Sequence, residues 1–180
     1  TLHGAPAPPS TSAHDVEAEA GVVARWVGHA LDHRALPAGS RVRAGEELDR
    51  VRAMLAGPRP GPAALVHRDL HDKQVLVAPA GDVGVLDLDT LAWGETALDV
   101  ANLLVHLELR ALQGGCPLSR AEVAAAAFLD GYRPAPAVTA RLGAFAASTR
   151  LRLACVYAFR PTWAGVVSAL LERPQVPLAV

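Results

Sequence analysis

The stretch Val66-His67-Arg68-Asp69-Leu70-His71-Asp72-Lys73-Gln74-Val75-Leu76-Val77 sets a dense polar run between two short apolar, β-branched runs. A second stretch, Gly84-Val85-Leu86-Asp87-Leu88-Asp89, is a further apolar run that ends in acid. The turn residues Pro79-Ala80-Gly81-Asp82 separate strands predicted at Val75–Ala78 and Val83–Leu88, which indicates a β-hairpin. A turn followed by this hairpin is expected to bring Asp69, Gln74 and Asp87 together.

These three residue types suit phosphoryl transfer. That reaction needs a carboxylate to orient an attacking hydroxyl and accept its proton, and metal ions held by oxygen ligands. Asp69, in the loop after the first strand, fits the base. Gln74 offers a carboxamide oxygen and Asp87 a charged metal ligand. The competing interpretations are a solvated turn aspartate, a surface amide and a strand-end acid that caps the next loop.

Helical apolar spacing dominates the remainder of the chain and predicts an α+β, mostly helical fold. Asp15 is expected to cap the first helix, and Ser119 with Glu122 is expected to form a capping box. Leu91–Thr96 is predicted as a loop containing Gly94, after a short strand at Ala64–Val66. The tail from Pro174 is expected to fray. The expected helices lie at about Asp15–Ala35, Gly45–Leu55, Ala97–Gln113, Ser119–Tyr132, Ala137–Ala158 and Pro161–Glu172; the one from Ala97 is apolar nearly all round and therefore buried.

Composition narrows the class of protein. The 180 residues are 51% apolar with a formal net charge of −1, which predicts a globular chain without nucleic-acid or membrane partners. Residues 1–13 are rich in Pro, Ala and Ser and are expected to be a flexible arm or linker. Cys116 and Cys155 have no metal-binding spacing, which is typical of reduced thiols in a cytoplasmic protein.

The motifs resemble the catalytic half of the protein-kinase-like fold. His67-Arg68-Asp69 with a carboxamide five positions after the aspartate is similar to the HRDxxxxN loop, and Val85–Asp89 resembles the strand that leads into the DFG aspartate. Leu70-His71 and the run Gly94-Glu95-Thr96-Ala97-Leu98-Asp99-Val100-Ala101 resemble the aminoglycoside phosphotransferase family, with the match spanning roughly residues 64–107.

The resemblance implies a role for each matching residue. Asp69 would be the catalytic base, and Gln74 and Asp87 would hold the Mg²⁺ that bridges the phosphates of ATP. Asp99 would tether the catalytic loop through its backbone, and His67 would pack beneath the loop. The acceptor would be a small-molecule hydroxyl, bound between the loop and the helices after Gln113.

The sequence departs from the family pattern at several positions. Gln74 replaces the usual Asn, which moves the ligand oxygen by about 1 Å. Arg68 stands where aminoglycoside enzymes more often have Gly. Asp89 replaces the DFG glycine and is interpreted as a surface or turn acid or, alternatively, as an additional acid near the metals. Lys73 is the only lysine, so no Gly-rich loop with a strand lysine precedes the motif. Residues 14–180 are therefore expected to be a C-terminal lobe, incomplete as an enzyme, whose N-terminal ATP lobe belongs to the parent chain.

Alternatives remain at this point. The first hypothesis is a small-molecule kinase, and the second is a non-catalytic, pseudokinase-like binding module. The third is a helical regulatory domain in which the motif is coincidental. His71 and Trp93 are candidates for substrate contacts; the alternative interpretation is that both side chains have packing roles. Three acids are candidates for an acidic wall that faces a cationic acceptor: Glu108, Glu122 and Asp130. The alternative is that they lie on solvated helix faces.

Overall fold

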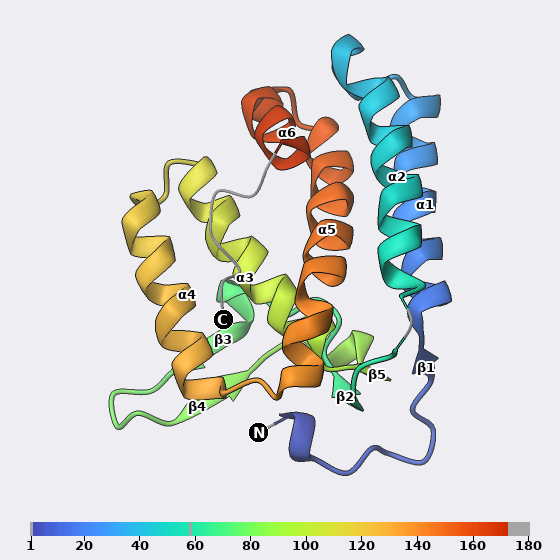
Figure 1. Cartoon of the computed structure of the whole chain (residues 1–180). Coiled ribbons are helices and arrows are strands. Elements are labelled where there is room, and N and C mark those ends of the chain that lie inside the picture. The colour runs from blue at the N-terminus through green and yellow to red at the C-terminus, as the bar shows by residue number, and fades with distance from the viewer. Residues whose placement is uncertain (1, 58, 173–180) are drawn as a thin grey trace.

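Helices make up most of the protein, and the strands gather at one end of it. The computed structural model describes residues 2–57 and 59–172. Figure 1 shows the helices running away from two small β-sheets. The helices are α1 (Val16–Asp32), α2 (Arg41–Leu55), α3 (Ala97–Leu112), α4 (Leu118–Tyr132), α5 (Pro136–Ala158) and α6 (Ala164–Leu171). The strands are β1 (Ala13–His14), β2 (Ala63–Val66), β3 (Val75–Val77), β4 (Val83–Val85) and β5 (Ala92–Glu95).

Helix α5 is the centre of the packing, since it contacts α1, α2, α3 and α6. Its residues from Leu142 to Cys155 are buried on most sides, as are the residues of α3 from Ala97 to Val105. A helix that is apolar nearly all round gains from burial on every face, which explains why α3 lies between α4 and α5. The described helices include none that is long and apolar enough to cross a lipid bilayer.

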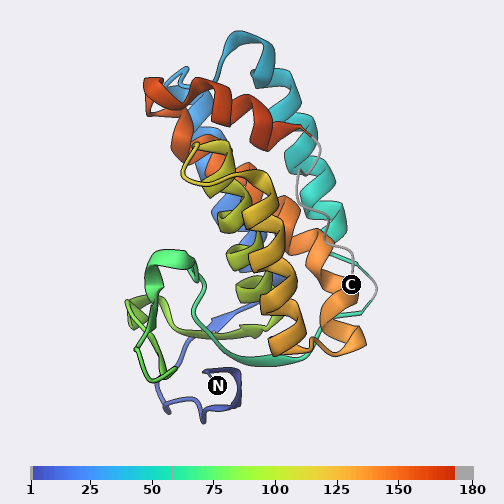
Figure 2. The same ribbon diagram turned by 90° about the vertical axis from the view of Figure 1, so that its left-hand side faces the viewer.

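The two sheets and the N-terminal segment lie at the same end of the helical part, as Figures 1 and 2 show from perpendicular directions. One sheet has the order β1-β5-β2, with β2 antiparallel to β5 and β1 parallel to it. The other is the hairpin β3–β4, in which Val75 lies opposite Val85. The hairpin therefore returns the chain to the loop that leaves β2.

A buried ion pair fixes the sheet against the helices. Arg141 of α5 donates from Nε to Glu95 Oε2 at 2.8 Å and from Nη2 to the Leu55 carbonyl at 2.8 Å. The same carboxylate oxygen accepts the backbone N–H of Gly61 at 2.7 Å. A buried charge is tolerated when it is paired and hydrogen-bonded, so these bonds join the end of β5 to α2 and α5.

The loop predicted at Leu91–Thr96 is wrong, because Ala92–Glu95 forms the central strand β5. Gly94 is typical of a loop in the sequence, but a Cβ at this position would lie 2.8 Å from the His14 carbonyl oxygen. The glycine is needed because β1 approaches the backbone closely here.

The predicted cap at Ser119 is also wrong. Helix α4 begins at Leu118 after an extended Pro117, whose carbonyl accepts the backbone N–H groups of Arg120 and Ala121. At the first helix, by contrast, Asp15 caps α1 as predicted and accepts the N–H of Ala18 at 2.8 Å. The stretch predicted as one helix from Pro161 divides into a 3-10 turn, Pro161–Trp163, and α6, and the tail from Pro174 lies outside the described residues.

Candidate active site

The polar loop after β2 is held by a carboxylate at the start of α3. Asp99 is fully buried, and its Oδ2 accepts the backbone N–H of His67 at 2.7 Å while its Oδ1 accepts that of Arg68 at 2.8 Å. Hydrogen bonds to an ionised acceptor are stronger than those between neutral groups. The first turn of α3 therefore fixes the backbone immediately before Asp69.

His67 joins this loop to the end of the hairpin. Its ring is fully buried, and Nε2 lies 2.7 Å from the Leu86 carbonyl oxygen, which can only accept. Nε2 therefore carries the proton, and Nδ1 accepts the backbone N–H of Asp69 at 3.3 Å. The imidazole thus sets the positions of Asp69 and of the residue before Asp87 at the same time.

The carbonyl side of the loop is held by two residues that sequence reasoning missed. Thr90 Oγ1 donates to the His67 carbonyl at 2.6 Å, and Asn102 Nδ2 donates to the Arg68 carbonyl at 2.6 Å. Asn102 stands three residues after Asp99 and therefore shares its face of α3. A polar amide in an otherwise apolar helical stretch was the signal that could have identified it.

Arg68 has a left-handed backbone, with φ at 71°. This conformation costs an L-residue about 1–2 kcal/mol, whereas glycine adopts it freely. The backbone explains why glycine is common at this position in the family that the motif resembles.

We therefore expect Arg68→Gly to be more stable than Arg68→Ala by about 1 kcal/mol, because both variants lose the side chain and only alanine keeps the strain. Urea unfolding of the two variants gives the difference directly. An alanine variant as stable as the glycine variant would contradict the strained loop.

Asp69 lies at the surface with a carboxylate open to ligands. Its side chain is 44% exposed, with Arg152 Nη1 at 3.6 Å from Oδ1 and His71 Nε2 at 3.9 Å from Oδ2. Asp69, Arg152 and Trp26 are among the residues that line a pocket of about 190 Å³. Arg152 and Trp26 come from α5 and α1, far from the motif in sequence, so the motif alone could not indicate them.

Gln74 and Asp87 meet across the hairpin. The Gln74 amide Nε2 donates to Asp87 Oδ2 at 3.0 Å, and both side chains reach the surface. The Gln74 carbonyl also accepts the backbone N–H of Leu86 at 2.9 Å, which extends the ladder to the residue before Asp87. The structure therefore brings two oxygen-bearing side chains together beside the loop that carries Asp69.

The other sequence candidates are dispersed. Asp89 is exposed in the turn Leu88–Thr90, and Trp93 is 44% exposed on β5 and does not line the pocket beside Asp69. Glu108 cannot form an acidic wall, because it is fully buried and accepts from Arg150 Nη2 at 2.6 Å. Both predictions for Glu108, a place in an acidic wall and a place on a solvated helix face, are therefore wrong. The other two acids, Glu122 and Asp130, are exposed.

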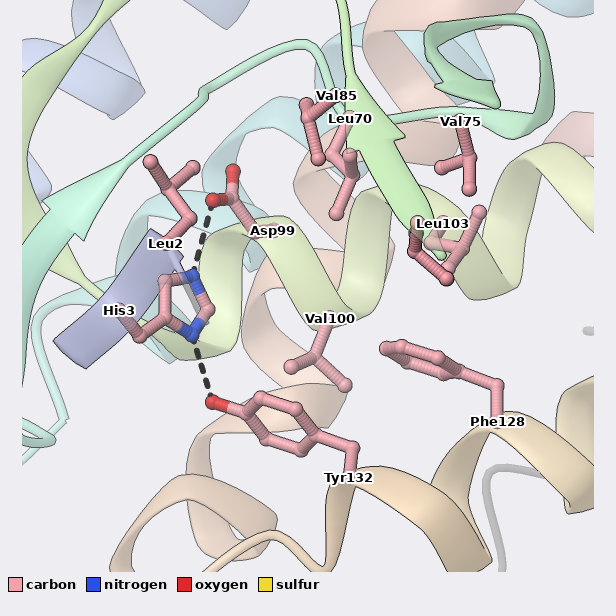
Figure 3. A pocket seen from close by; sticks show the side chains of 11 residues that line it. Leu2, His3, Leu70, Val75, Val85, Asp99, Val100, Leu103, Phe128 and Tyr132 are labelled. Atoms are coloured by element: carbon pink, nitrogen blue, oxygen red, sulfur yellow. Dashed lines mark hydrogen bonds and ion pairs between the residues drawn. The ribbon is translucent and has the colours of Figure 1, made fainter. Parts of the chain in front are cut away.

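The segment predicted as an arm contributes a further contact to Asp99. His3, in a short 3-10 turn at Leu2–Gly4, lies 3.0 Å through Nε2 from Asp99 Oδ2 and 2.8 Å through Nδ1 from the Tyr132 hydroxyl. Figure 3 shows the ring between these partners, at the edge of an apolar pocket of about 380 Å³. Burial raises the pKa of Tyr132, so its O–H donates to His3 while the other ring nitrogen donates to the carboxylate. This segment therefore docks onto the base of the polar loop.

Together these features define the class of protein. It is a helical domain in which the buried Asp99 holds the polar loop that carries Asp69. A hairpin beside this loop brings Gln74 to Asp87. A model of the phosphotransferase enzyme family matches residues 1–145. The chain belongs to this family, which confirms the resemblance to the aminoglycoside phosphotransferases and implies a kinase-like fold. No curated protein matches the chain.

Proposed function

We propose that the protein is a small-molecule kinase that transfers the γ-phosphate of ATP to a hydroxyl group with the help of Mg²⁺. The observations that support this proposal are the contact between Gln74 and Asp87 and the His67 ring, which bonds both to the backbone N–H of Asp69 and to the Leu86 carbonyl next to Asp87. Membership of a phosphotransferase family supports the reaction class.

The donor atoms at the hairpin fit Mg²⁺. This ion prefers oxygen ligands and is commonly held by one or two carboxylates, substrate phosphates and water. Asp87 provides two carboxylate oxygens, of which Oδ1 is free of the bond to Gln74, and Gln74 provides a carbonyl oxygen after rotation of its amide. When bound there, the ion neutralises phosphate charge. We propose Asp87 and Gln74 as its protein ligands.

Asp69 supplies the proton acceptor. The acceptor hydroxyl donates to the open carboxylate, and its oxygen attacks the γ-phosphorus as the bond to ADP breaks. The hydroxyl proton passes to the Asp69 carboxylate. Arg152, whose Nη1 lies 3.6 Å from Asp69 Oδ1, helps to hold the carboxylate in place.

The lobe that covers ATP is proposed to belong to the same parent protein. Exposed apolar side chains on the hairpin and on the segment that follows it support this, because Leu76 is 53% exposed and Leu86 and Leu88, on either side of Asp87, are each 44% exposed. Neighbouring exposed apolar side chains indicate a surface that another group covers. A nucleotide ring and the lobe above it are the occupants that the proposal assigns.

The alternative is a binding module without turnover, and the Gln74 amide favours it, since its nitrogen rather than its oxygen faces Asp87. Binding of Mg·ATP together with phosphoryl transfer separates the two proposals, because the module would give no transfer.

We expect the full-length protein to gain thermal stability from Mg·ATP, by about 1.4 kcal/mol at ten times Kd. Asp87→Asn is expected to remove most of this gain, because the amide loses the charge that attracts the ion. The matched control is Asp82→Asn, an exposed acid in the turn of the same hairpin, which should keep the full gain. Differential scanning fluorimetry measures all three proteins. No Mg-dependent gain in the wild type at millimolar Mg·ATP would exclude the kinase.

A further inference from the structure

A second pocket adjoins the polar loop at His71, Asp72 and Lys73. It has a volume of about 200 Å³ and lies between the turn after Asp69, α3 and the end of α5. We call it the basic pocket; the lining residues that matter here are His71, Lys73, His106, Arg110, Tyr157 and Arg160. We propose that the basic pocket binds an anionic group, a carboxylate or phosphate monoester, on the acceptor whose hydroxyl is phosphorylated. The inference rests on the proposed function, because it names the substrate class of the same site.

The charge of the lining favours an anion. Lys73, Arg110 and Arg160 are cations, and Asp72 is the one carboxylate that lines the pocket within the described residues. That carboxylate is already engaged, since its Oδ2 accepts from Arg110 Nε at 2.6 Å. Three cations against one paired acid, in a chain with a net charge of −1, concentrate positive potential at this place.

Two of the cations have N–H groups available for a ligand. Within residues 2–57 and 59–172, no acidic side chain forms an ion pair with Lys73 or Arg160. The Arg160 guanidinium lies over the Tyr157 ring, 4.7 Å from its centroid, which orients the side chain and leaves the N–H edge open. A guanidinium held in this way is suited to bind a carboxylate or a phosphate.

The two histidines of the basic pocket are neutral hydrogen-bonding groups. Their ring centroids lie 4.8 Å apart with the ring planes tilted by 30°. Burial lowers the pKa of His106 to about 3 and also lowers that of His71. Within the described part of the chain, His106 Nε2 is buried and has no hydrogen-bond partner. A buried polar nitrogen without a partner costs stability, and a ligand recovers that cost only where a shift of the ring brings Nε2 to the pocket surface.

A metal ion is the competing occupant. Ligand atoms of His71, Asp72 and His106 lie within 4.8 Å of one another. However, Arg110 already occupies the Asp72 carboxylate, and Lys73 and Arg160 line the same space, so a cation entering it would meet like charges. The lining therefore favours an anion over a metal ion.

The position of the basic pocket relates it to phosphoryl transfer. His71 lines it, and the Nε2 of the same ring lies 3.9 Å from Asp69 Oδ2. An acceptor with its anionic group beside His71 can therefore present a hydroxyl to Asp69. Among the described lining residues, a polycationic acceptor would meet three cations and one carboxylate, Asp72, which is already paired with Arg110.

Binding of inorganic phosphate to the 180-residue chain tests the pocket without requiring catalysis. We expect saturable shifts of the His71 and His106 ring resonances in NMR titrations with phosphate. Lys73→Gln and Arg160→Gln should each weaken binding about tenfold, since each removes one charge-assisted contact. The control Arg43→Gln, an exposed cation on α2, should bind as the wild type does. Absence of saturable shifts, equal binding by all variants, or displacement of phosphate by Zn²⁺ at the two histidines would overturn the inference.

Two further measurements test whether the basic pocket binds the acceptor or the nucleotide, and which acceptors are phosphorylated. Mg·ATP should leave the phosphate-induced shifts unchanged in the full-length protein; if it abolishes them, the pocket serves the nucleotide phosphates and the inference fails. Transfer assays should favour hydroxy acids and sugar phosphates over amino sugars. Transfer only to amino sugars would overturn the acceptor class and keep the kinase, whereas phosphate binding without transfer to any acceptor would overturn the kinase and keep the anion pocket.

Discussion

Replacing Asp99 by alanine is expected to lower the free energy of unfolding by about 3–5 kcal/mol, the largest loss of stability among the site residues. The carboxylate is fully buried and accepts three hydrogen bonds, two from the backbone of His67 and Arg68 and one from the His3 ring. Alanine would leave those donors buried and unpaired, and an unsatisfied buried donor costs about 1–3 kcal/mol.

The isosteric Asp99→Asn variant tests the charge separately from the volume. Its amide has one accepting oxygen, so its NH₂ group would face one of the two backbone N–H groups, and donor would meet donor. We expect a loss of about 2–4 kcal/mol in urea unfolding. Asp130→Ala, which removes an exposed acid from α4, should change stability by less than about 0.5 kcal/mol. An Asp99→Ala loss equal to that of Asp130→Ala would show that the loop is not held through Asp99.

Local patterns were sufficient for the elements that depend on neighbours in sequence. Apolar spacing predicted the six helical regions within a few residues of their ends, and the turn at Pro79–Asp82 predicted the antiparallel pairing of β3 with β4. The same short range brings the Gln74 side chain to Asp87, since the hairpin register sets Gln74 against Leu86, the residue before Asp87.

The features that were missed depend on pairing between distant segments. Strand β5 exists because β1 and β2 pair with it from either side, and no periodicity in Ala92–Glu95 indicates this. Arg152 reaches Asp69 across the packing of α5 against the loop, and His3 reaches Asp99 from a segment whose composition resembles a linker. In each case tertiary contact overrides local propensity, which a single sequence does not reveal.

The burial of charged side chains is a second feature that the sequence pattern did not predict. Glu and Arg are residue types that usually lie on exposed helix faces. Arg150 Nη2 nevertheless donates to Glu108 Oε2 at 2.6 Å inside the helical packing. The correction bears on function, because the acidic wall that would suit a cationic acceptor loses one of its three members. The charged residues that do face a pocket next to the loop are mainly basic.

Replacing Asp69 by asparagine is expected to lower phosphoryl transfer by about 10²- to 10⁴-fold, the range in which a positioned general base contributes. The amide has the same size and can still hydrogen-bond to the acceptor hydroxyl, but it cannot take up the proton. Because Asp69 is not one of the proposed metal ligands, Kd for Mg·ATP should stay within about twofold of the wild type. Steady-state rates and nucleotide titrations of the full-length protein give the two numbers.

The same experiment distinguishes a base from a residue that only holds the loop. The Asp69 side chain is 44% exposed, and its contact with Arg152 is a partly solvated ion pair, which limits the stability that it contributes to about 1 kcal/mol or less. Asp69→Asn should therefore unfold at nearly the wild-type urea concentration, in contrast to Asp99→Ala, and Asp82→Asn should retain full turnover. A loss of activity that tracks a loss of stability would assign Asp69 a structural role. A loss of activity at constant stability and constant Mg·ATP affinity is the result that a proton acceptor requires, because only the transition state depends on the group that was removed.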